Sequence, residues 1–243
     1  MKLHFAISRN SKAQFLKKKI NKLYKNYSPK KSDAIVVCGG DGFMLLTLQK
    51  FYKLKKPFYG INCGNLGYLL NSFKIFNILD AIKQSKKIII NPLEVVIFSK
   101  KGKIKKYIAV NEVSLLRQSK QTCSLKIKVN KKILLSKLVG DGIILSTPIG
   151  STGYNSSAGG PKLNLNSSKL ALTPVSPFYP KNWKGKIINN NSNIEITNTK
   201  INRPISLVAD NTESRNLKKT FIFLNKKIKI ELLFDPTNDF KKK

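Results

Sequence analysis

The stretch that decides the fold is Asp33-Ala34-Ile35-Val36-Val37-Cys38-Gly39-Gly40-Asp41-Gly42. Its apolar part is an unbroken run, as in strands that are buried on both faces of a parallel sheet. The glycines end this run, and residues 43–52 then have the apolar periodicity of a helix. A further short strand over 57–62 stops at a second glycine turn over 64–67. This order predicts a right-handed parallel crossover, whose ligands bind beyond the carboxyl ends of the strands.

The sequence patterns before and after this stretch differ. On its N-terminal side, residues 3–8 are a strand candidate and residues 12–24 are a helix candidate. The apolar stripe of that helix comprises Phe15, Leu16, Ile20, Leu23 and Tyr24. From about residue 88 onward, short β segments follow one another between turn residues, among them 88–98, 104–117 and 227–233. Their spacing is typical of a β-sandwich.

We therefore expect two domains. Residues 1–90 would form an α/β N-terminal domain with a parallel sheet, and residues 91–234 an all-β sandwich C-terminal domain, followed by a short C-terminal tail over 235–243. The length of 243 residues and the apolar fraction of 41% are sufficient for both cores. Neither a run of about 18 uncharged apolar residues nor a cleavable leader pattern occurs, which predicts a soluble, cytoplasmic protein without a membrane partner.

The net charge of +34 would ordinarily indicate a nucleic-acid partner. However, only four of the 46 basic residues are arginines, and the lysines are spread along the whole chain. Recognition of base edges and bidentate recognition of phosphate favour arginine. We therefore expect no specific nucleic-acid partner, although weak, salt-sensitive binding of polyanions is expected as a side property.

The scarce residues restrict the chemistry. The three cysteines form no C-x-x-C pair, so neither a disulfide framework nor a thiolate zinc site is supported. His4 is the only histidine, which excludes a multi-histidine metal cage, and we expect no metal site built by the protein alone. Catalysis must use carboxylates, hydroxyls, lysines and backbone amides. Four of the twelve acidic residues stand in polar or glycine-containing clusters: Asp41, Glu112, Asp141 and Asp210.

The Gly39-Gly40-Asp41-Gly42 turn joins a strand to a helix, so its amides and the helix N-terminus can face a phosphate. The alternative is an ordinary turn in which Asp41 is the N-cap. For Gly64-Asn65-Leu66-Gly67-Tyr68, the alternative is a connecting turn with Tyr68 in the core. Neither the Walker nor the Rossmann glycine pattern occurs in the sequence.

Two further clusters lie in the β-rich part. Asn111 and Glu112 interrupt the β-like run 108–116, where a solvated strand face explains the carboxylate more easily than it explains the pair. The run 140–161 combines an acid with many hydroxyls, an aromatic side chain and glycines. These groups suit a nucleoside, and the apolar strand 143–145 argues against a flexible linker.

In combination, these motifs resemble the NAD kinase family. They are G-G-D-G at 39–42, N-x-G-x-L-G-Y at 62–68, N-E at 111–112 and D-G-x-x-x-S-T-P-x-G-S-T-x-Y-x-x-S-A-G-G-P at 141–161, in the family's order. The resemblance implies an α/β domain and a β-sandwich domain assembled as a homodimer or homotetramer. It also implies transfer of a phosphoryl group from ATP or another donor to the 2′-hydroxyl of the adenosine ribose of NAD, giving NADP.

The resemblance also implies roles for individual residues. Asp41 would be the catalytic base and Gly42 a phosphate-binding residue. Tyr68, Asn111, Glu112 and Asp141 would bind the substrate, the last at the nicotinamide end and across a subunit interface. The adenine and ribose pocket would be lined by Thr152, Gly153, Tyr154, Asn155, Ser156 and Ser157. Mg²⁺ or another divalent metal would arrive with ATP, held by phosphates and waters, and no prosthetic group is implied.

Some positions depart from the family pattern. Val139 stands where arginine is frequent, Thr122 where a basic residue or histidine is common, and Asn211-Thr212 follows Asp210 in place of Gly-Gln. The C-terminal helix expected after the last strand is nearly absent. Two other functions stay open at this point. A lipid kinase would share the G-G-D-G turn, and a nucleic-acid-binding protein would use the basic charge.

Overall fold

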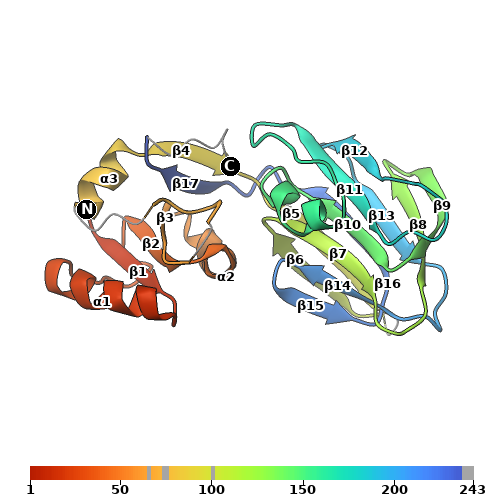
Figure 1. Cartoon of the computed structure of the whole chain (residues 1–243), viewed down its shortest axis with the longest axis horizontal. Helices are drawn as coiled ribbons and strands as arrows, with labels where there is room; N and C mark the ends of the chain where they lie inside the picture. The colour runs from red at the N-terminus through yellow and green to blue at the C-terminus, as the bar shows by residue number, and fades with distance from the viewer. Residues whose placement is uncertain (65–66, 73–76, 100–101, 237–243) are drawn as a thin grey trace. The chain divides into compact units, whose positions relative to one another are not determined.

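A computed structural model describes residues 1–64, 67–72, 77–99 and 102–236 of the chain (Figure 1). The chain divides into two units. The first contains residues 1–90 together with 228–243, and the second contains residues 91–227. The chain therefore leaves the first unit after Ile90 and returns to it at Ile228.

The first unit is built on a five-stranded sheet in the order β1-β2-β3-β17-β4. Its strands are β1 (Leu3–Ile7), β2 (Ala34–Gly39), β3 (Phe58–Asn62), β17 (Ile230–Phe234) and β4 (Lys86–Ile90). The first four strands in this order are parallel, and β4 is antiparallel to β17. Every residue of β2 is buried, as the unbroken apolar run predicts. The predicted α/β domain with a parallel sheet is confirmed.

Helices connect these strands: α1 (Ser11–Leu23), α2 (Asp41–Phe51) followed by the 3₁₀ turn η1 (Tyr52–Leu54), and α3 (Ile78–Gln84). Asn10 caps α1, because its side chain accepts a hydrogen bond from the backbone amide of Ala13. The predicted stripe of α1 is partly wrong. Leu16 and Ile20 are buried together with Ala13, whereas Phe15 points away from this stripe and is 56% exposed. Leu23, the last residue of the helix, is also exposed.

The strand β17 corrects the predicted domain boundary. It lies between β3 and β4 in the sheet of the first unit, where Figure 1 shows it in dark blue beside the yellow β4. The assignment of residues 91–234 to one domain is therefore wrong for β17. Local patterning identifies an apolar strand here but not its partners, which are far away in sequence. Of the predicted tail 235–243, Asp235 is buried in the first unit, and residues 237–243 lie outside the described residues.

The second unit consists of two six-stranded antiparallel sheets, which confirms the predicted β-sandwich. One sheet has the order β12-β11-β10-β7-β14-β15 and the other β6-β5-β16-β13-β8-β9. A single apolar cluster with members on both sheets forms the core. The strands are β5 (Leu93–Ser99), β6 (Ile104–Ala109), β7 (Glu112–Arg117), β8 (Cys123–Val129), β9 (Lys132–Gly140), β10 (Gly142–Ser146), β11 (Lys169–Val175), β12 (Lys186–Asn189), β13 (Ile194–Asn198), β14 (Ile205–Ala209), β15 (Thr212–Arg215) and β16 (Leu217–Leu224).

Two predicted β segments are each divided by a polar or proline-containing break. The segment 104–117 forms β6 and β7, which belong to different sheets, with Asn111 between them. The segment 88–98 is divided at Asn91-Pro92, where the chain passes from the first unit to the second. In each case the interruption of the apolar pattern marks a change of sheet, which explains the amide and carboxylate inside a β-like run.

Candidate active site

The carboxylate of Asp41 connects the two glycine turns of the first unit. Asp41 is the first residue of α2, and Gly40, not Asp41, is its N-cap, so the N-cap alternative is wrong. The Oδ2 atom of Asp41 accepts a hydrogen bond from the amide of Tyr68 at 2.8 Å, and Oδ1 accepts one from Leu69 at 2.9 Å. Each carboxylate oxygen keeps a further lone pair for a ligand. Asp41 is therefore held in one orientation and still able to accept a proton.

The glycines of the first turn differ in the space around them. A Cβ atom at Gly39 would lie 2.7 Å from Cδ1 of Phe43, so this glycine is needed for packing. A Cβ at Gly40 or Gly42 would meet no atom within 4 Å. Open space beside amides at a helix N-terminus is the arrangement that phosphate groups use. Tyr68 is 40% exposed, so the alternative that places it in the core is also wrong, while Asn65 and Leu66 lie outside the described residues.

In the second unit, Asn111 and Glu112 carry buried polar atoms that lack partners. Among the residues that the structure describes, Oδ1 of Asn111 and Oε2 of Glu112 are both buried without a hydrogen bond. Such atoms cost free energy unless a ligand or water satisfies them. Burial, and after it the negative charge of Asp210, raises the pKa of Glu112 to about 7. Each of the two side chains thus carries an acceptor oxygen that no described group uses.

The run after β10 folds into a tight loop that contains the 3₁₀ turn η2 (Gly150–Thr152) and the short helix α4 (Tyr154–Ser157). Thr147 fixes its start, because its hydroxyl donates to the carbonyl of Val110 at 2.8 Å. A Cβ at Gly150 would lie 2.2 Å from the carbonyl oxygen of Asn111, so only glycine permits this approach. A Cβ at Gly153 would lie 3.7 Å from Oε2 of Glu112. The loop is therefore packed directly against the Asn111-Glu112 pair.

The predicted pocket residues of this loop have two different environments. Asn155 is fully buried, and its side chain donates to the carbonyls of Ser151 and Pro161 and accepts from the hydroxyl of Thr173. These hydrogen bonds of Asn155 stabilise the fold of the loop. The residues with at least partly exposed surface are Thr152, Gly153, Tyr154, Ser156 and Ser157, of which Tyr154 is 40% exposed. The loop thus presents hydroxyls and one aromatic side chain beside Glu112.

Asp141 lies at the other end of the strand pair from Glu112. In the antiparallel register of β7 and β10, Glu112 faces Ser146, whereas Leu116 faces Gly142. Asp141, which precedes Gly142, is thus offset from Glu112 by five residues along the strands, about 17 Å at roughly 3.4 Å per residue. The structure does not bring Asp141 to the Asn111-Glu112 pair of the same chain.

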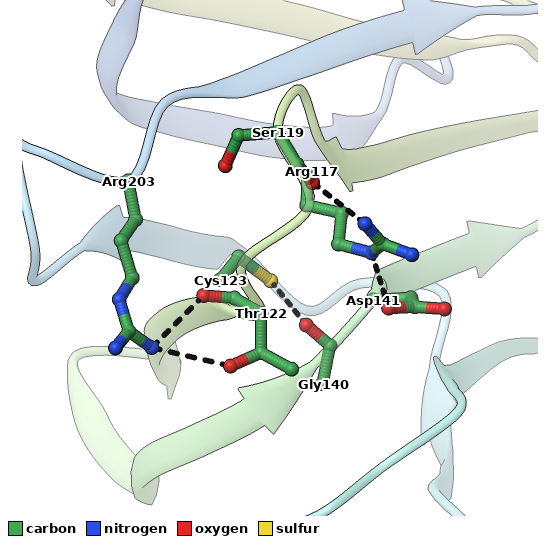
Figure 2. Close-up of polar contacts among 7 residues, drawn as sticks. All are labelled: Arg117, Ser119, Thr122, Cys123, Gly140, Asp141 and Arg203. Atoms are coloured by element: carbon green, nitrogen blue, oxygen red, sulfur yellow. Dashed lines mark hydrogen bonds and ion pairs between the residues drawn. The ribbon is translucent and has the colours of Figure 1, made fainter.

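Two arginines that were not predicted as site residues make side-chain contacts in this part of the sandwich: Arg117 pairs with Asp141, and Arg203 bonds Thr122. Figure 2 shows Arg117 directed at Asp141, with its Nε donating to Oδ1. Arg203 donates to both the carbonyl and the hydroxyl of Thr122 at 3.2 Å. At Val139, where arginine is frequent in the resembled family, the backbone bonds to Phe178 and Tyr179. The scarcity of arginine in a lysine-rich chain was the signal that could have identified Arg117 and Arg203.

Apart from Asp141, the predicted site residues fall into two groups. Asp41, Gly42 and Tyr68 come together in the first unit, and the Asn111-Glu112 pair and the loop 147–161 come together in the second. Within the described ranges, no group of three or more His, Cys, Asp or Glu side chains could hold a metal ion. No described helix is both long and apolar enough to cross a membrane.

Known proteins resemble this chain over most of its length. A family model described as the ATP-NAD kinase C-terminal domain matches residues 110–224. The NAD kinase of Zymomonas mobilis is 40% identical over 230 residues, which cover 93% of this chain and 89% of that protein. The NAD kinase of Rickettsia bellii is 39% identical over 236 residues, which cover 96% of this chain and 92% of that protein.

Two solved structures share the fold. One is an NAD kinase from Archaeoglobus fulgidus in complex with ATP, with a TM-score of 0.79 and 22% identity, over 100% of this chain and 96% of that chain. The other is yeast NADH kinase complexed with NADH, with a TM-score of 0.78 and 22% identity, over 90% of this chain and 67% of that chain. The first comparison covers both units and thus supports the two-unit architecture as a whole.

Proposed function

The chain belongs to the NAD kinase family and phosphorylates NAD to NADP, and we propose that Asp41 is the base of this reaction. The observation that carries the assignment is the carboxylate of Asp41, fixed by the amides of Tyr68 and Leu69 beside the open space over Gly40 and Gly42. Asp41 takes the proton of the adenosine ribose 2′-hydroxyl. The freed oxygen forms a bond to the terminal phosphorus of ATP, and the bond from that phosphorus to ADP breaks.

The amides at the N-terminus of α2, including that of Gly42, bind the transferred phosphoryl group. The positive end of the helix favours negative charge, and a Cβ built at Gly40 or Gly42 would meet no atom within 4 Å. Mg²⁺ or another divalent metal, bound mainly by the phosphates of ATP and by water, would neutralise charge on those phosphates. Oxygens of this kind are the ligands that Mg²⁺ prefers, and the described part of the chain holds no cluster of acids that would form a cage instead.

NAD is held in the second unit. The acceptors Oδ1 of Asn111 and Oε2 of Glu112 take hydrogen bonds from ribose hydroxyls, which would satisfy both buried atoms. Tyr154 provides an aromatic surface for a base, and the hydroxyls of Thr152, Ser156 and Ser157 bind polar edges. Tyr68, which is exposed beside Asp41, is a further substrate contact.

Asp141 contacts the nicotinamide end of NAD from another copy of the chain, in a homodimer or homotetramer. Within one chain, Asp141 is offset from Glu112 by five residues of the β7–β10 pair, so the two carboxylates do not share one nucleoside-binding site. A cytoplasmic location is proposed from the three cysteines, all of which are free thiols.

An assay of the purified chain tests the activity against its alternatives. Formation of NADP from NAD and ATP in the presence of Mg²⁺ is the expected result, with polyphosphate in place of ATP as the test of donor range. Phosphorylation of diacylglycerol vesicles under the same conditions would instead indicate a lipid kinase. Sequence-selective DNA binding at physiological salt, without NADP formation, would indicate the nucleic-acid function.

A further inference from the structure

Asp210 makes an unusual set of backbone contacts. It is one of the two turn residues of the β14–β15 hairpin, between Ala209 and Thr212, and has a left-handed backbone with φ of 49°. Its Oδ2 accepts a hydrogen bond from the amide of Val110 at 2.7 Å. Its Oδ1 accepts hydrogen bonds from the amides of Asn111 and Glu112 at 2.9 and 3.2 Å. One carboxylate thus binds three consecutive amides.

Asp210 also donates a hydrogen bond to the same segment: its backbone amide bonds the carbonyl of Glu112 at 3.1 Å. The segment held in this way is the crossing from β6 to β7, where the chain changes sheet and no ladder can satisfy all of its amides. Hydrogen bonds to a carboxylate are roughly twice as strong as those between neutral groups. The hairpin turn therefore fixes the backbone of Asn111 and Glu112 from a distant part of the sequence.

We propose that Asp210 is a positioning residue of the NAD site, which holds Asn111 and Glu112 so that their unpartnered oxygens meet the hydroxyls of a ribose. This inference rests on the proposed binding of NAD by the second unit. Asp210 itself acts through the backbone of these two residues. Among the described residues, Oδ1 of Asn111 and Oε2 of Glu112 are buried without a hydrogen-bond partner, so both oxygens remain available as acceptors for such hydroxyls.

Because Asp210 is charged, the proposal predicts a pH dependence of the KM for NAD that a purely structural role of Asp210 would not produce. Asp210 is the charged group whose field acts on Glu112, and together with burial it raises the pKa of Glu112. The ionised form of Glu112 accepts hydrogen bonds from ribose hydroxyls without competing as a donor. The KM for NAD should accordingly fall as the pH rises through about 7.

The test compares Asp210→Asn with Glu195→Gln. Glu195 lies on β13 in the other sheet of the same unit and pairs with Lys128 and Lys219, so the control removes the same charge elsewhere. In Asp210→Asn, an amide NH₂ replaces one acceptor and faces a backbone N–H. The KM for NAD should rise about tenfold or more, with kcat and the KM for ATP within about threefold. The pH midpoint of the KM for NAD should move below that of the wild type. Glu195→Gln should change neither the KM for NAD nor its pH midpoint.

A second variant covers the case in which Asp210→Asn does not fold. Asp210→Glu keeps the charge but is too long by one methylene, so it should raise the KM for NAD while leaving the pH midpoint in place. Unchanged NAD constants in either folded variant would overturn the role of Asp210. An equal loss of all activities in proportion to the folded fraction would also overturn it. If the wild-type chain formed no NADP, the proposed function itself would fail, which separates the two conclusions.

Discussion

The amide of Tyr68 donates a hydrogen bond to Oδ2 of Asp41 over 2.8 Å, so the second glycine turn orients the carboxylate of the first. The two residues are brought together because β2 and β3 are adjacent parallel strands whose carboxyl ends meet at one edge of the sheet. The orientation of the Asp41 carboxylate therefore depends on both turns.

Replacing Asp41 by Asn should lower kcat by a factor of about 10² to 10⁴, because the amide cannot accept the proton of the 2′-hydroxyl. The affinity for NAD should stay within a few-fold, since Asn keeps the size of the side chain. Steady-state kinetics and calorimetric titration with NAD measure the two quantities separately. A variant with nearly wild-type kcat would eliminate Asp41 as the base. A large loss of NAD affinity would mean that the change had displaced the Tyr68 turn.

Replacing Gly42 by Ala should impair phosphoryl transfer without destabilising the protein. Gly42 lies in the first turn of α2 with open space around it, so alanine is tolerated and can raise stability by up to about 1 kcal/mol. The added methyl group would occupy the space proposed for a phosphate, and we expect a loss in kcat/KM for ATP of about tenfold. Gly39→Ala is the matched control, since its Cβ would clash with Phe43 and lower the melting temperature. Full activity in Gly42→Ala would place the phosphate elsewhere.

The stability of the ligand-free protein should depend on the ionisation of Glu112. The folded protein keeps this carboxyl protonated up to a pKa of about 7, whereas the unfolded chain releases the proton near 4.5. Between these values the folded state binds more protons, so the contribution of Glu112 to the free energy of unfolding falls as the pH rises. Glu112→Gln removes this contribution.

Urea unfolding of both proteins at pH 5 and pH 8 measures the effect. The stability of Glu112→Gln relative to the wild type should be greater at pH 8 than at pH 5. An equal difference at the two pH values would show that Glu112 titrates as an ordinary surface carboxyl.

Asp141→Ala should raise the KM for NAD and leave the KM for ATP nearly unchanged, because a group that contacts only the acceptor cannot act on the donor directly. Arg117→Met is the matched control, since it breaks the same ion pair and keeps the carboxylate. The pair is about one-third exposed, so its loss should cost at most about 1 kcal/mol of stability in either variant. If Arg117→Met raised the KM for NAD as much as Asp141→Ala, the intact pair and not the acceptor alone would recognise NAD.

The sequence predicts well what local patterning determines. The unbroken apolar run of β2 and the glycines that follow it leave few alternatives to a buried strand and a turn, and both occur at the expected residues. The two-domain fold class was predicted because alternating strand and helix segments give way to short β segments near residue 88. The hydroxyl-rich loop was recognisable because its composition fits neither a strand nor a linker.

Long-range pairing could not be predicted in the same way. Nothing in the composition of β17 indicates that it pairs with β3 and β4 rather than with a strand of the sandwich. The contacts of Asp210 with Glu112 span 98 residues, and only the presence of an acid in a lysine-rich chain pointed to them. The register of β7 with β10, which separates Asp141 from Glu112, is likewise a property of the assembled sheet.

The return of β17 to the first sheet has a consequence for the order of synthesis. Since β17 lies between β3 and β4, a ribosome must translate the whole sandwich before the first sheet can be completed. Until then, the nascent first unit has β3 and β4 without the strand that joins them, and their edges are open to other chains. The sandwich is contiguous in sequence and can close earlier, so the later unit in the gene is the first that can finish folding.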